Sequence, residues 1–382
     1  RLQPASPEVV VEWLGETFPA VTQVDRRTIA EFSNGNFRVA RAIAETVRKG
    51  ETLGQLKSRE LFQRLFQQRN DSDHTLQRAA EGLALLYSID GEDTSESGEL
   101  ANVAALTGLS IRVLYDALAT LQRRDIAQRR GRWRAILPQA IANPLAAEAL
   151  RHIPPADFDR FCAALTPRMQ RSLSRRLGYL HDSAAALDIV RRWLRADGPL
   201  GDLIARGDEG LRIISNIAPV APELALSRIE SAMEGDIGQQ VLDPDSHERW
   251  PWIRLIKQLA YEAPLFERAA ELLVRFVIPE PANHHKTASS LFAELFQLQL
   301  SGTEAPPDQR RAFVRTLACS EDPERIRCAG IALDGLLKGH HFISMSDFDF
   351  GARSRGWGWQ PANYGDLCDW YANAIDLAIE LL

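Results

Sequence analysis

Residues 99–137, ELANVAALTGLSIRVLYDALATLQRRDIAQRRGRWRAIL, carry the pattern that decides the fold. Two helical segments at 99–107 and 110–123 are joined by a short turn at Gly108, and Ala104 is small enough to let the helices approach closely. The second segment repeats apolar residues at helical spacing, so its inner face consists of Val113, Leu114, Ala117 and Leu118. The pattern predicts a helix-turn-helix.

The flanking residues extend this motif into a winged helix. Residues 125–137 alternate around the pair Arg130-Gly131, as expected of a two-stranded hairpin that turns there. An amphipathic helix at 75–89 and a polar loop at 90–98 precede the motif, and another helix begins at Ser58. Three helices followed by a hairpin predict a winged-helix domain, which we assign to residues 58–142.

The N-terminal residues 1–57 predict a small helical domain. The Ser-Pro-Glu sequence at 6–8 is a helix start, because Ser caps free N–H groups, Pro suits the first turn and Glu favours the positive helix end. A second helix at 25–33 stops at the Asn-Gly-Asn turn 34–36, where Gly and Asn tolerate a left-handed backbone. A third helix follows from Phe37.

The rest of the chain predicts an array of helices. From 143 to 339 every segment reads as helix, with breaks at Pro, Gly or Asp. Repeated helix pairs are typical of an α-solenoid with HEAT or armadillo-like units, although the sequence has no fixed period. Residues 340–382 form an aromatic-rich tail and a terminal helix. We therefore predict an all-α, mainly helical protein with one small β-hairpin.

Composition narrows the class of protein. The 382 residues are 45% hydrophobic with a formal net charge of -6, and no stretch approaches the ~18 consecutive apolar residues of a membrane helix. The sequence starts at Arg1, with neither an initiator Met nor the apolar run of a signal sequence, so we expect it to be a piece of a longer protein. Four Cys residues without CxxC or zinc-type spacing fit a reducing cytoplasm.

Motifs that carry chemistry are missing from the sequence. We find no phosphate loop (GxxxxGK[ST]), no GxSxG nucleophile motif, no zinc-binding HExxH and no dinucleotide-binding GxGxxG. Adjacent His residues at 284–285 and 340–341 would point apart on a helix. The sequence therefore predicts neither catalytic residues nor a metal site.

The turn within residues 33–41 suggests a ligand. A Gly-containing turn that leads into a helix N-terminus, with Arg38 in the first turn, offers amide donors and a cation to a phosphate or a base. A plain helix–helix turn would have the same pattern. The segment resembles the Gly-Asn-Pro-Arg turn in the helical lid of AAA+-related signalling ATPases, the STAND class of NTPases. In that class a winged helix follows the lid and helical repeats follow the winged helix.

The resemblance implies roles for particular residues. ATP or ADP, held by an NTPase core upstream in the same polypeptide, would lie against a lid turn formed by Asn34, Gly35, Asn36, Phe37 and Arg38. Asn36 and Phe37 would lie near the base or ribose, and Arg38 near the phosphates. Phe37 departs from the family, which usually has Pro there, and stacking on adenine is left open. Without the upstream Walker motifs, the chain alone would be no enzyme and hold no cofactor, although the full-length protein would be an ATPase.

The predicted winged helix has a basic face formed by Arg123, Arg124, Arg129, Arg130, Arg132 and Arg134. In a DNA-binding protein these side chains would contact phosphates. The start of the second helix, 110–115, is too apolar to read bases, which makes nucleic acid the less favoured partner. In the STAND class this module packs on the ATPase core and moves, and we favour that role over a merely solvated face. A winged-helix transcription regulator with a helical sensing domain is the alternative.

The tail offers a partner surface made of Trp357, Trp359, Tyr364 and Trp370, although such residues also close the ends of solenoids. Taken together, the resemblance predicts the regulatory and sensor portion of a STAND NTPase. A protein target or ligand on the solenoid would control a nucleotide-dependent switch and homo-oligomerisation. Bacterial members of the class act in signalling or antiphage defence, so such a role is expected here.

Overall fold

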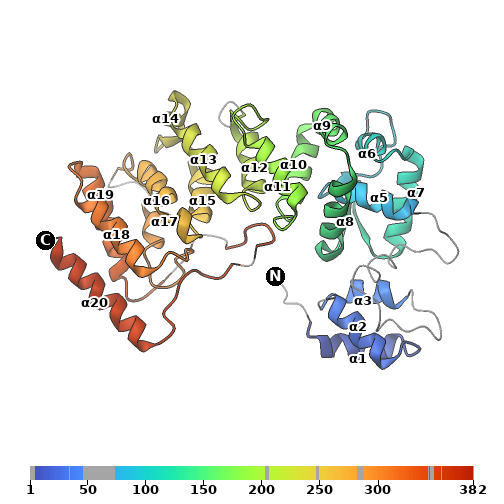
Figure 1. Ribbon diagram of the computed structural model, residues 1–382, viewed down its shortest axis with the longest axis horizontal. Helices are drawn as coiled ribbons and strands as arrows, with labels where there is room; N and C mark the ends of the chain where they lie inside the picture. Colours follow the sequence, from blue (N-terminus) through green and yellow to red (C-terminus); the bar gives the residue numbers. More distant parts are fainter. Residues whose placement is uncertain are drawn as a thin grey trace. The chain divides into compact units, whose positions relative to one another are not determined.

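The protein is mainly helical (Figure 1). The computed structural model describes residues 5–33, 35–45, 74–202, 206–246, 249–281, 288–342, 344, 348–353 and 355–381. Helices make up 64% of the structure, and the described residues form 19 helices and one small three-stranded antiparallel sheet. The chain divides into two compact units, Arg1–Arg176 and Leu177–Leu382.

The first unit begins with three short helices, α1 (Pro7–Thr17), α2 (Gln23–Ser33) and α3 (Phe37–Ala44). The predicted start is confirmed, since Ser6 is the N-cap of α1 and a Pro opens the helix, although the Ser6 side chain makes no capping hydrogen bond. Apolar residues at helical spacing bury completely between the helices: Val10, Leu14, Ile29, Ala30, Ala40 and Ile43. The helix predicted from Ser58 lies outside the described residues.

The predicted helix-turn-helix and hairpin belong to a helix–sheet segment of six elements. They are α5 (Thr75–Ala84), β1 (Ile89–Asp90), α6 (Glu99–Thr107), α7 (Ile111–Arg123), β2 (Ala127–Arg130) and β3 (Trp133–Ile136). The strands lie in the order β1-β3-β2, and the hairpin turns where predicted, with Arg130 opposite Trp133. The predicted helix 75–89 was too long. The helix ends at Ala84, because Ile89 and Asp90 instead form strand β1, which pairs with β3.

Turn chemistry explains these boundaries. Gly108 ends α6 with φ 66°, a left-handed conformation that Gly adopts more readily than residues with a Cβ. Ser110 then caps α7, where its Oγ accepts a hydrogen bond from Val113 N at 3.2 Å. Gly131 turns the hairpin with φ 60°. The apolar faces meet in a common core: Leu83, Leu100, Val103, Leu114, Leu118, Leu121, Ile126 and Ile136.

Three helices complete the first unit, α8 (Gln139–His152), α9 (Pro155–Ala164) and α10 (Pro167–Leu177). Arg176 of α10 is fully buried, and its Nε donates to the Ala84 carbonyl at the end of α5 at 2.8 Å. The last carbonyls of a helix have no partner inside the helix, so this guanidinium satisfies one of them from a neighbouring element.

The second unit is an array of helices that follow one another along the chain. They are α11 (Ala184–Trp193), α12 (Gly207–Ile217), α13 (Pro222–Met233), α14 (Asp236–Leu242), α15 (Arg249–Leu259), α16 (Ala263–Val277), α17 (Ala288–Glu294), α18 (Pro307–Ala318), α19 (Pro323–Leu337) and α20 (Tyr364–Glu380). Phenylalanine rings fill the core between α16, α17 and α18, with centroids 5.1–6.1 Å apart: Phe266, Phe292, Phe296 and Phe313. Such ring pairs stabilise a core beyond the area that they bury.

Arginine side chains tie the helices of this array together. Arg275 of α16 donates to the Met233 carbonyl at the end of α13 at 2.6 Å, and Arg249 of α15 donates to a carbonyl in the last turn of α16. Arg310 of α18 is fully buried and donates to three carbonyls, those of Gln297, Thr303 and Ala305, at 2.9–3.1 Å. Each guanidinium thereby satisfies backbone groups that would otherwise be buried without a partner.

Candidate functional site

The turn before α3 is explained by local contacts among the described residues. Gly35 has φ 75°, and Asn36 caps α3 by accepting hydrogen bonds from the amides of Arg38 and Val39 at 3.1 and 3.3 Å. Phe37 packs edge-on against Trp13, with ring centroids 5.1 Å apart. The Asn36 oxygen thus occupies two of the amides that a phosphate would need, and Asn34 lies outside the described residues.

The exposed Arg38 points toward the helix–sheet segment. Its guanidinium faces the side-chain amide of Gln128 on β2. Arg41, one turn later on α3, lies 3.6 Å from the Asp125 carboxylate and 2.8 Å from Glu45. Arg38 and Arg41 therefore connect α3 with the residues around the start of the hairpin.

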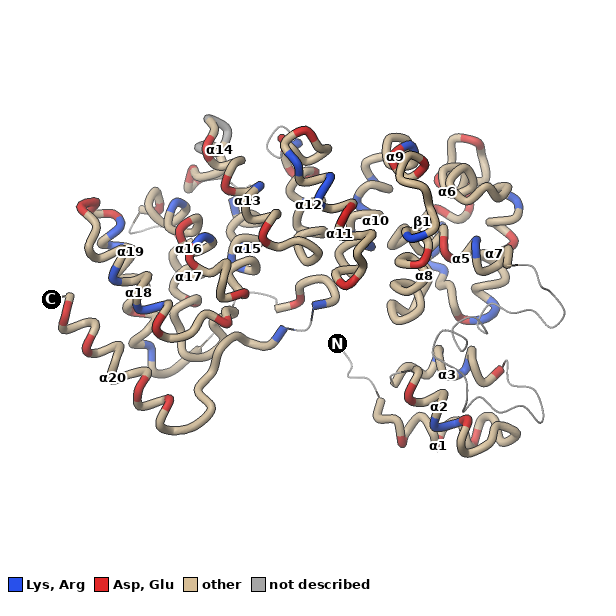
Figure 2. Tube along the Cα trace, viewed as in Figure 1, with Lys and Arg blue, Asp and Glu red and all other residues tan. Residues whose placement is uncertain are grey.

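The helix–sheet segment has no net charge. Residues 75–136 contain eight Arg and no Lys, balanced by eight Asp and Glu. Figure 2 shows residues of both signs on α5 and on α7. Non-specific DNA binding depends on uncompensated cations, so this balance argues against a strong phosphate-binding face.

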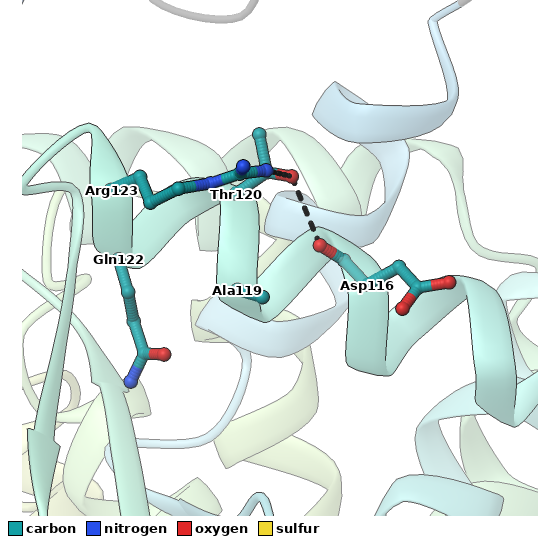
Figure 3. A pocket seen from close by; sticks show the side chains of 5 residues that line it. All are labelled: Asp116, Ala119, Thr120, Gln122 and Arg123. Atoms are coloured by element: carbon teal, nitrogen blue, oxygen red, sulfur yellow. Dashed lines mark hydrogen bonds between the residues drawn. The ribbon is translucent and has the colours of Figure 1, made fainter.

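The exposed face of α7 carries an open hollow lined by Asp116, Ala119, Thr120, Gln122 and Arg123 (Figure 3). Its side chains bond to one another: Arg123 donates to Thr120 Oγ1 at 3.0 Å, and Thr120 donates to the Asp116 carbonyl at 3.0 Å. Arg112 pairs with Asp116 at 3.0 Å one turn earlier, and Tyr115 is 41% exposed. The face is small, mixed in charge and partly aromatic.

Three of the six arginines of the predicted basic face are paired with acidic residues of the same segment. Arg132 forms an ion pair with Asp90, while Arg129 and Arg134 lie 2.9 and 3.2 Å from the Glu92 carboxylate. Only 7% of the Arg134 side chain is exposed, so including it in a solvent-facing surface was wrong. Arg134 is buried because its position in β3 faces the loop that follows β1. From the sequence this loop was predicted only to be polar, and a contact of its acidic residues with Arg134 was not expected. Arg123, Arg129, Arg130 and Arg132 are exposed, and Arg124 is half-buried.

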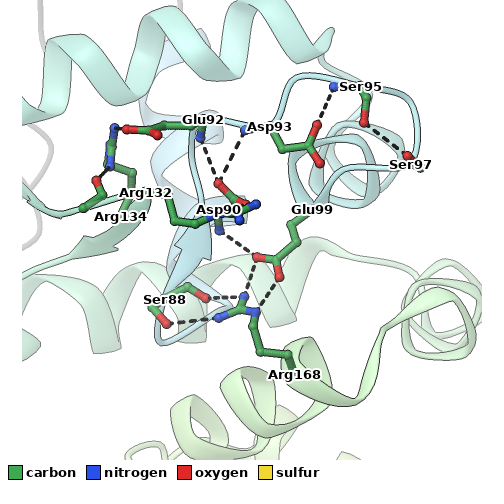
Figure 4. A network of polar contacts seen from close by, with 11 residues as sticks. Ser88, Asp90, Glu92, Asp93, Ser95, Ser97, Glu99, Arg132, Arg134 and Arg168 are labelled. Atoms are coloured by element: carbon green, nitrogen blue, oxygen red, sulfur yellow. Dashed lines mark hydrogen bonds and ion pairs between the residues drawn. The ribbon is translucent and has the colours of Figure 1, made fainter.

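A polar network joins β1, α6, the hairpin and α10 (Figure 4). The backbone N–H of Asp90 donates to the Glu99 carboxylate at 2.7 Å, and Glu99 forms an ion pair with Arg168. Arg168 also donates to the Ser88 carbonyl at 3.0 Å, and its guanidinium lies 4.5 Å from the Trp133 ring centroid. This single side chain therefore fixes the sheet against α10.

Asp90 lies at the centre of this network. Burial is the largest single influence on the pKa of Asp90, and it raises that pKa. Hydrogen bonds from Arg132 and from the backbone N–H groups of Glu92 and Asp93 together outweigh burial and hold the pKa of Asp90 below its ordinary value. The carboxylate is charged at neutral pH and organises the loop after β1.

The aromatic residues of the tail separate into two groups. Trp357 and Tyr364 are 59% and 78% exposed. Trp370 is 2% exposed, stacks on Trp359 at 5.6 Å and donates to the Leu336 carbonyl at 2.9 Å. Assigning Trp370 to a partner surface was therefore wrong, because its ring closes the contact between α19 and α20.

Among the residues that the structure describes, no group of three or more His, Cys, Asp or Glu side chains is placed to hold a metal ion. In the same part of the chain, no single helix is both long and apolar enough to cross a membrane; α6 and α7 meet those criteria only when taken together, and they are bent by 101° relative to each other.

Comparison of the chain with protein-family models, with curated proteins and with solved structures finds no match.

Proposed function

We propose that this chain is the regulatory and sensor portion of a STAND-class NTPase. In this proposal α1–α3 belong to a helical lid, the helix–sheet segment belongs to a winged helix, and the helices within residues 143–339 form a helical-repeat sensor. The ATP-binding core would lie in polypeptide before Arg1. Antiphage defence or another form of signalling is the biological role that the resemblance suggests.

The helix–sheet segment is the observation that carries the proposal. Its element order, with a third strand pairing beside the hairpin, fits a winged helix. A DNA-reading winged helix presents free cations to phosphates, whereas here Arg129, Arg132 and Arg134 are bound to acidic residues of the same segment. Such internal compensation suits an element that packs on another protein domain.

The proposed mechanism is a shift between two arrangements of these parts. A target bound to the helical repeats would favour one arrangement by its differential affinity, and nucleotide exchange or oligomerisation would follow. The contacts of Arg38 and Arg41 with the hairpin support a joint between lid and winged helix. They are exposed, and exposed ion pairs are worth about 1 kcal/mol or less, so they can exchange for contacts with a core.

A nucleotide-binding measurement tests the lid assignment. In the full-length protein, Arg38→Ala is expected to weaken ADP binding about tenfold or more, because a hydrogen bond to a charged group contributes roughly 1.5–3 kcal/mol. Arg41→Ala is the matched control, since it removes the same side chain from the same helix three residues further on. Equal ADP affinities for both variants and the wild type would contradict the lid assignment.

DNA titration tests the alternative of a transcription regulator. With labelled duplex DNA at 50 and 200 mM salt, we expect at most non-specific binding, with a Kd of about 10⁻⁶ M or weaker at the higher salt. Nanomolar, sequence-dependent binding at 200 mM salt would favour the regulator instead.

A further inference from the structure

The segment between α19 and α20 lies across the second unit in the manner of a bound peptide. We call residues 348–353 and 355–363 the C-terminal arm. In Figure 1 it runs from beneath α12 back to α20. Near α20 it pairs main chain to main chain: Trp359 N donates to Thr303 O at 2.8 Å, and Gly302 N donates to Trp357 O at 2.9 Å. Extended peptides bind other proteins through the same kind of backbone ladder.

Two arginines hold the middle of the arm. Arg353 lies 3.1 Å and Arg355 3.5 Å from the same carboxylate oxygen of Glu262. The Arg355 guanidinium also lies 3.8 Å from the Phe350 ring centroid and 4.5 Å from that of Tyr261, and donates to the Gln258 carbonyl at 2.6 Å. Arg355 thus lies between the Tyr261 ring of the surface and the Phe350 ring of the arm itself, beside the Glu262 carboxylate; an aromatic face next to an acidic residue selects a guanidinium over an ammonium.

The arm is held mainly by polar contacts. Phe350 is its buried apolar anchor, whereas Trp357 is 59% exposed. Only 4% of the Arg355 side chain is exposed, and its Nη2 reaches the Glu262 carboxylate only at 3.5 Å, so a long ion pair compensates this buried cation less well than a short hydrogen bond would. A second arginine-containing peptide could form the same contacts.

We propose that the C-terminal arm is a displaceable internal ligand. The arm-binding surface, formed by Gln258, Tyr261, Glu262, Gly302 and Thr303, then takes an extended, arginine-containing segment of a protein partner. The partner's chemistry follows from Glu262, which receives two guanidinium groups, and from the backbone groups of residues 302–303, which the arm now occupies and which an extended partner segment would take over. This inference goes beyond the proposed function and does not depend on it.

Two glycines allow the arm to be released without altering the surface beneath it. Gly351 has φ 61°, and a Cβ there would lie 2.2 Å from the Gly178 carbonyl oxygen. Gly358 has φ 94°, and its Cβ would lie 2.5 Å from the Thr303 carbonyl oxygen. Alanine at these positions is therefore both strained and in collision with backbone. Gly356 has open space around its Cβ position and provides the matched control.

The experiment compares the full chain carrying G351A/G358A with the wild type and with G356A. Arm release is measured by mass spectrometry as trypsin cleavage after Arg353 and Arg355. Binding is measured by fluorescence anisotropy with a labelled peptide of residues 348–360, FDFGARSRGWGWQ. We expect faster cleavage and at least about tenfold tighter peptide binding for G351A/G358A, because a tethered arm competes at an effective concentration on the order of millimolar. A peptide with both arginines replaced by alanine should not bind.

Several results would overturn the proposal. The arm would be a fixed part of the fold if trypsin cleaved G351A/G358A no faster than G356A, or if the released surface bound the peptide no better than the wild type does. Equal binding of the arginine-free peptide would refute the partner chemistry. Should circular dichroism show that G351A/G358A loses helix, a chain with R353A/R355A provides the peptide-binding comparison, because it too leaves the arm-binding surface intact. It lacks both trypsin sites, so for this chain only the anisotropy decides: peptide binding no tighter than that of the wild type would overturn the proposal.

Discussion

Replacing Arg168 by alanine should loosen the sheet of the first unit from α10. The substitution removes the ion pair with Glu99, the hydrogen bonds to Ser88 and the contact with the Trp133 ring. Glu99 keeps its hydrogen bond from the Asp90 amide but loses its counter-ion while only 14% of its side chain is exposed. The local structure therefore loses both an attraction and the compensation of a nearly buried charge.

The expected loss is about 3 kcal/mol. A charge-assisted, bidentate pair contributes roughly 1.5–3 kcal/mol, and a cation over an indole face adds about 0.5–1 kcal/mol. The Arg168 side chain is 27% exposed, so we take the middle of the combined range. Because 1.4 kcal/mol corresponds to a factor of ten, amides protected by this contact should exchange roughly a hundredfold faster.

Hydrogen–deuterium exchange of residues 86–99 and 132–137 measures this effect. Arg160→Ala is the matched control on α9, because the Arg160 side chain is 80% exposed and its pair with Asp157 is an ordinary surface contact. Arg168→Lys should fall between the wild type and the alanine variant, since an ammonium keeps the charge but cannot bind in the bidentate manner. Exchange in Arg168→Ala within about threefold of the Arg160→Ala value would refute the reasoning.

Three further predictions concern buried groups. Lys257→Met should lower the free energy of unfolding by roughly 3–5 kcal/mol, because it leaves the Glu294 carboxylate buried, and Lys257→Met with Glu294→Leu should recover most of that loss in the same denaturation assay. Burial raises the pKa of Cys328 to about 11, so at pH 8 a thiol reagent should label it far more slowly than the exposed cysteines, Cys319 and Cys368; equal rates would contradict this. The pKa of Asp90 is depressed in the folded protein, so its stabilising contribution is present above about pH 4 and is lost as pH falls through the folded value; the stability difference between wild type and Asp90→Asn should therefore shrink between pH 7 and pH 3.

Local signals in the sequence were sufficient for much of the helix–sheet segment. Gly108, Ser110 and Gly131 each favour one backbone conformation, so the limits of α6, α7 and the hairpin could be predicted closely. Strand β1 could not, because two residues have no periodicity and Asp90 pairs with a strand more than forty residues away.

Burial of polar residues was the part of the candidate site that the sequence could not provide. Arg134 belongs to a residue type that is mostly exposed, and Trp370 to one that is also frequent in interfaces with partners, and nothing adjacent to them in sequence indicates that both are enclosed. Their burial depends on Glu92 and on the Leu336 carbonyl, which only the tertiary fold brings near. The roles of the turn at Gly35 and of the basic residues as regulatory elements stay predictions.

The arginines that cap neighbouring helices have a consequence for how such a protein can change. Each guanidinium fits one particular set of carbonyls, as Arg310 does with Gln297, Thr303 and Ala305, so the junctions that contain such an arginine are specific to their helices. Helices joined in this way are not interchangeable. Exchanging one helix pair for another, or building a consensus unit, should fail here unless the arginine and its carbonyl loop are transplanted together.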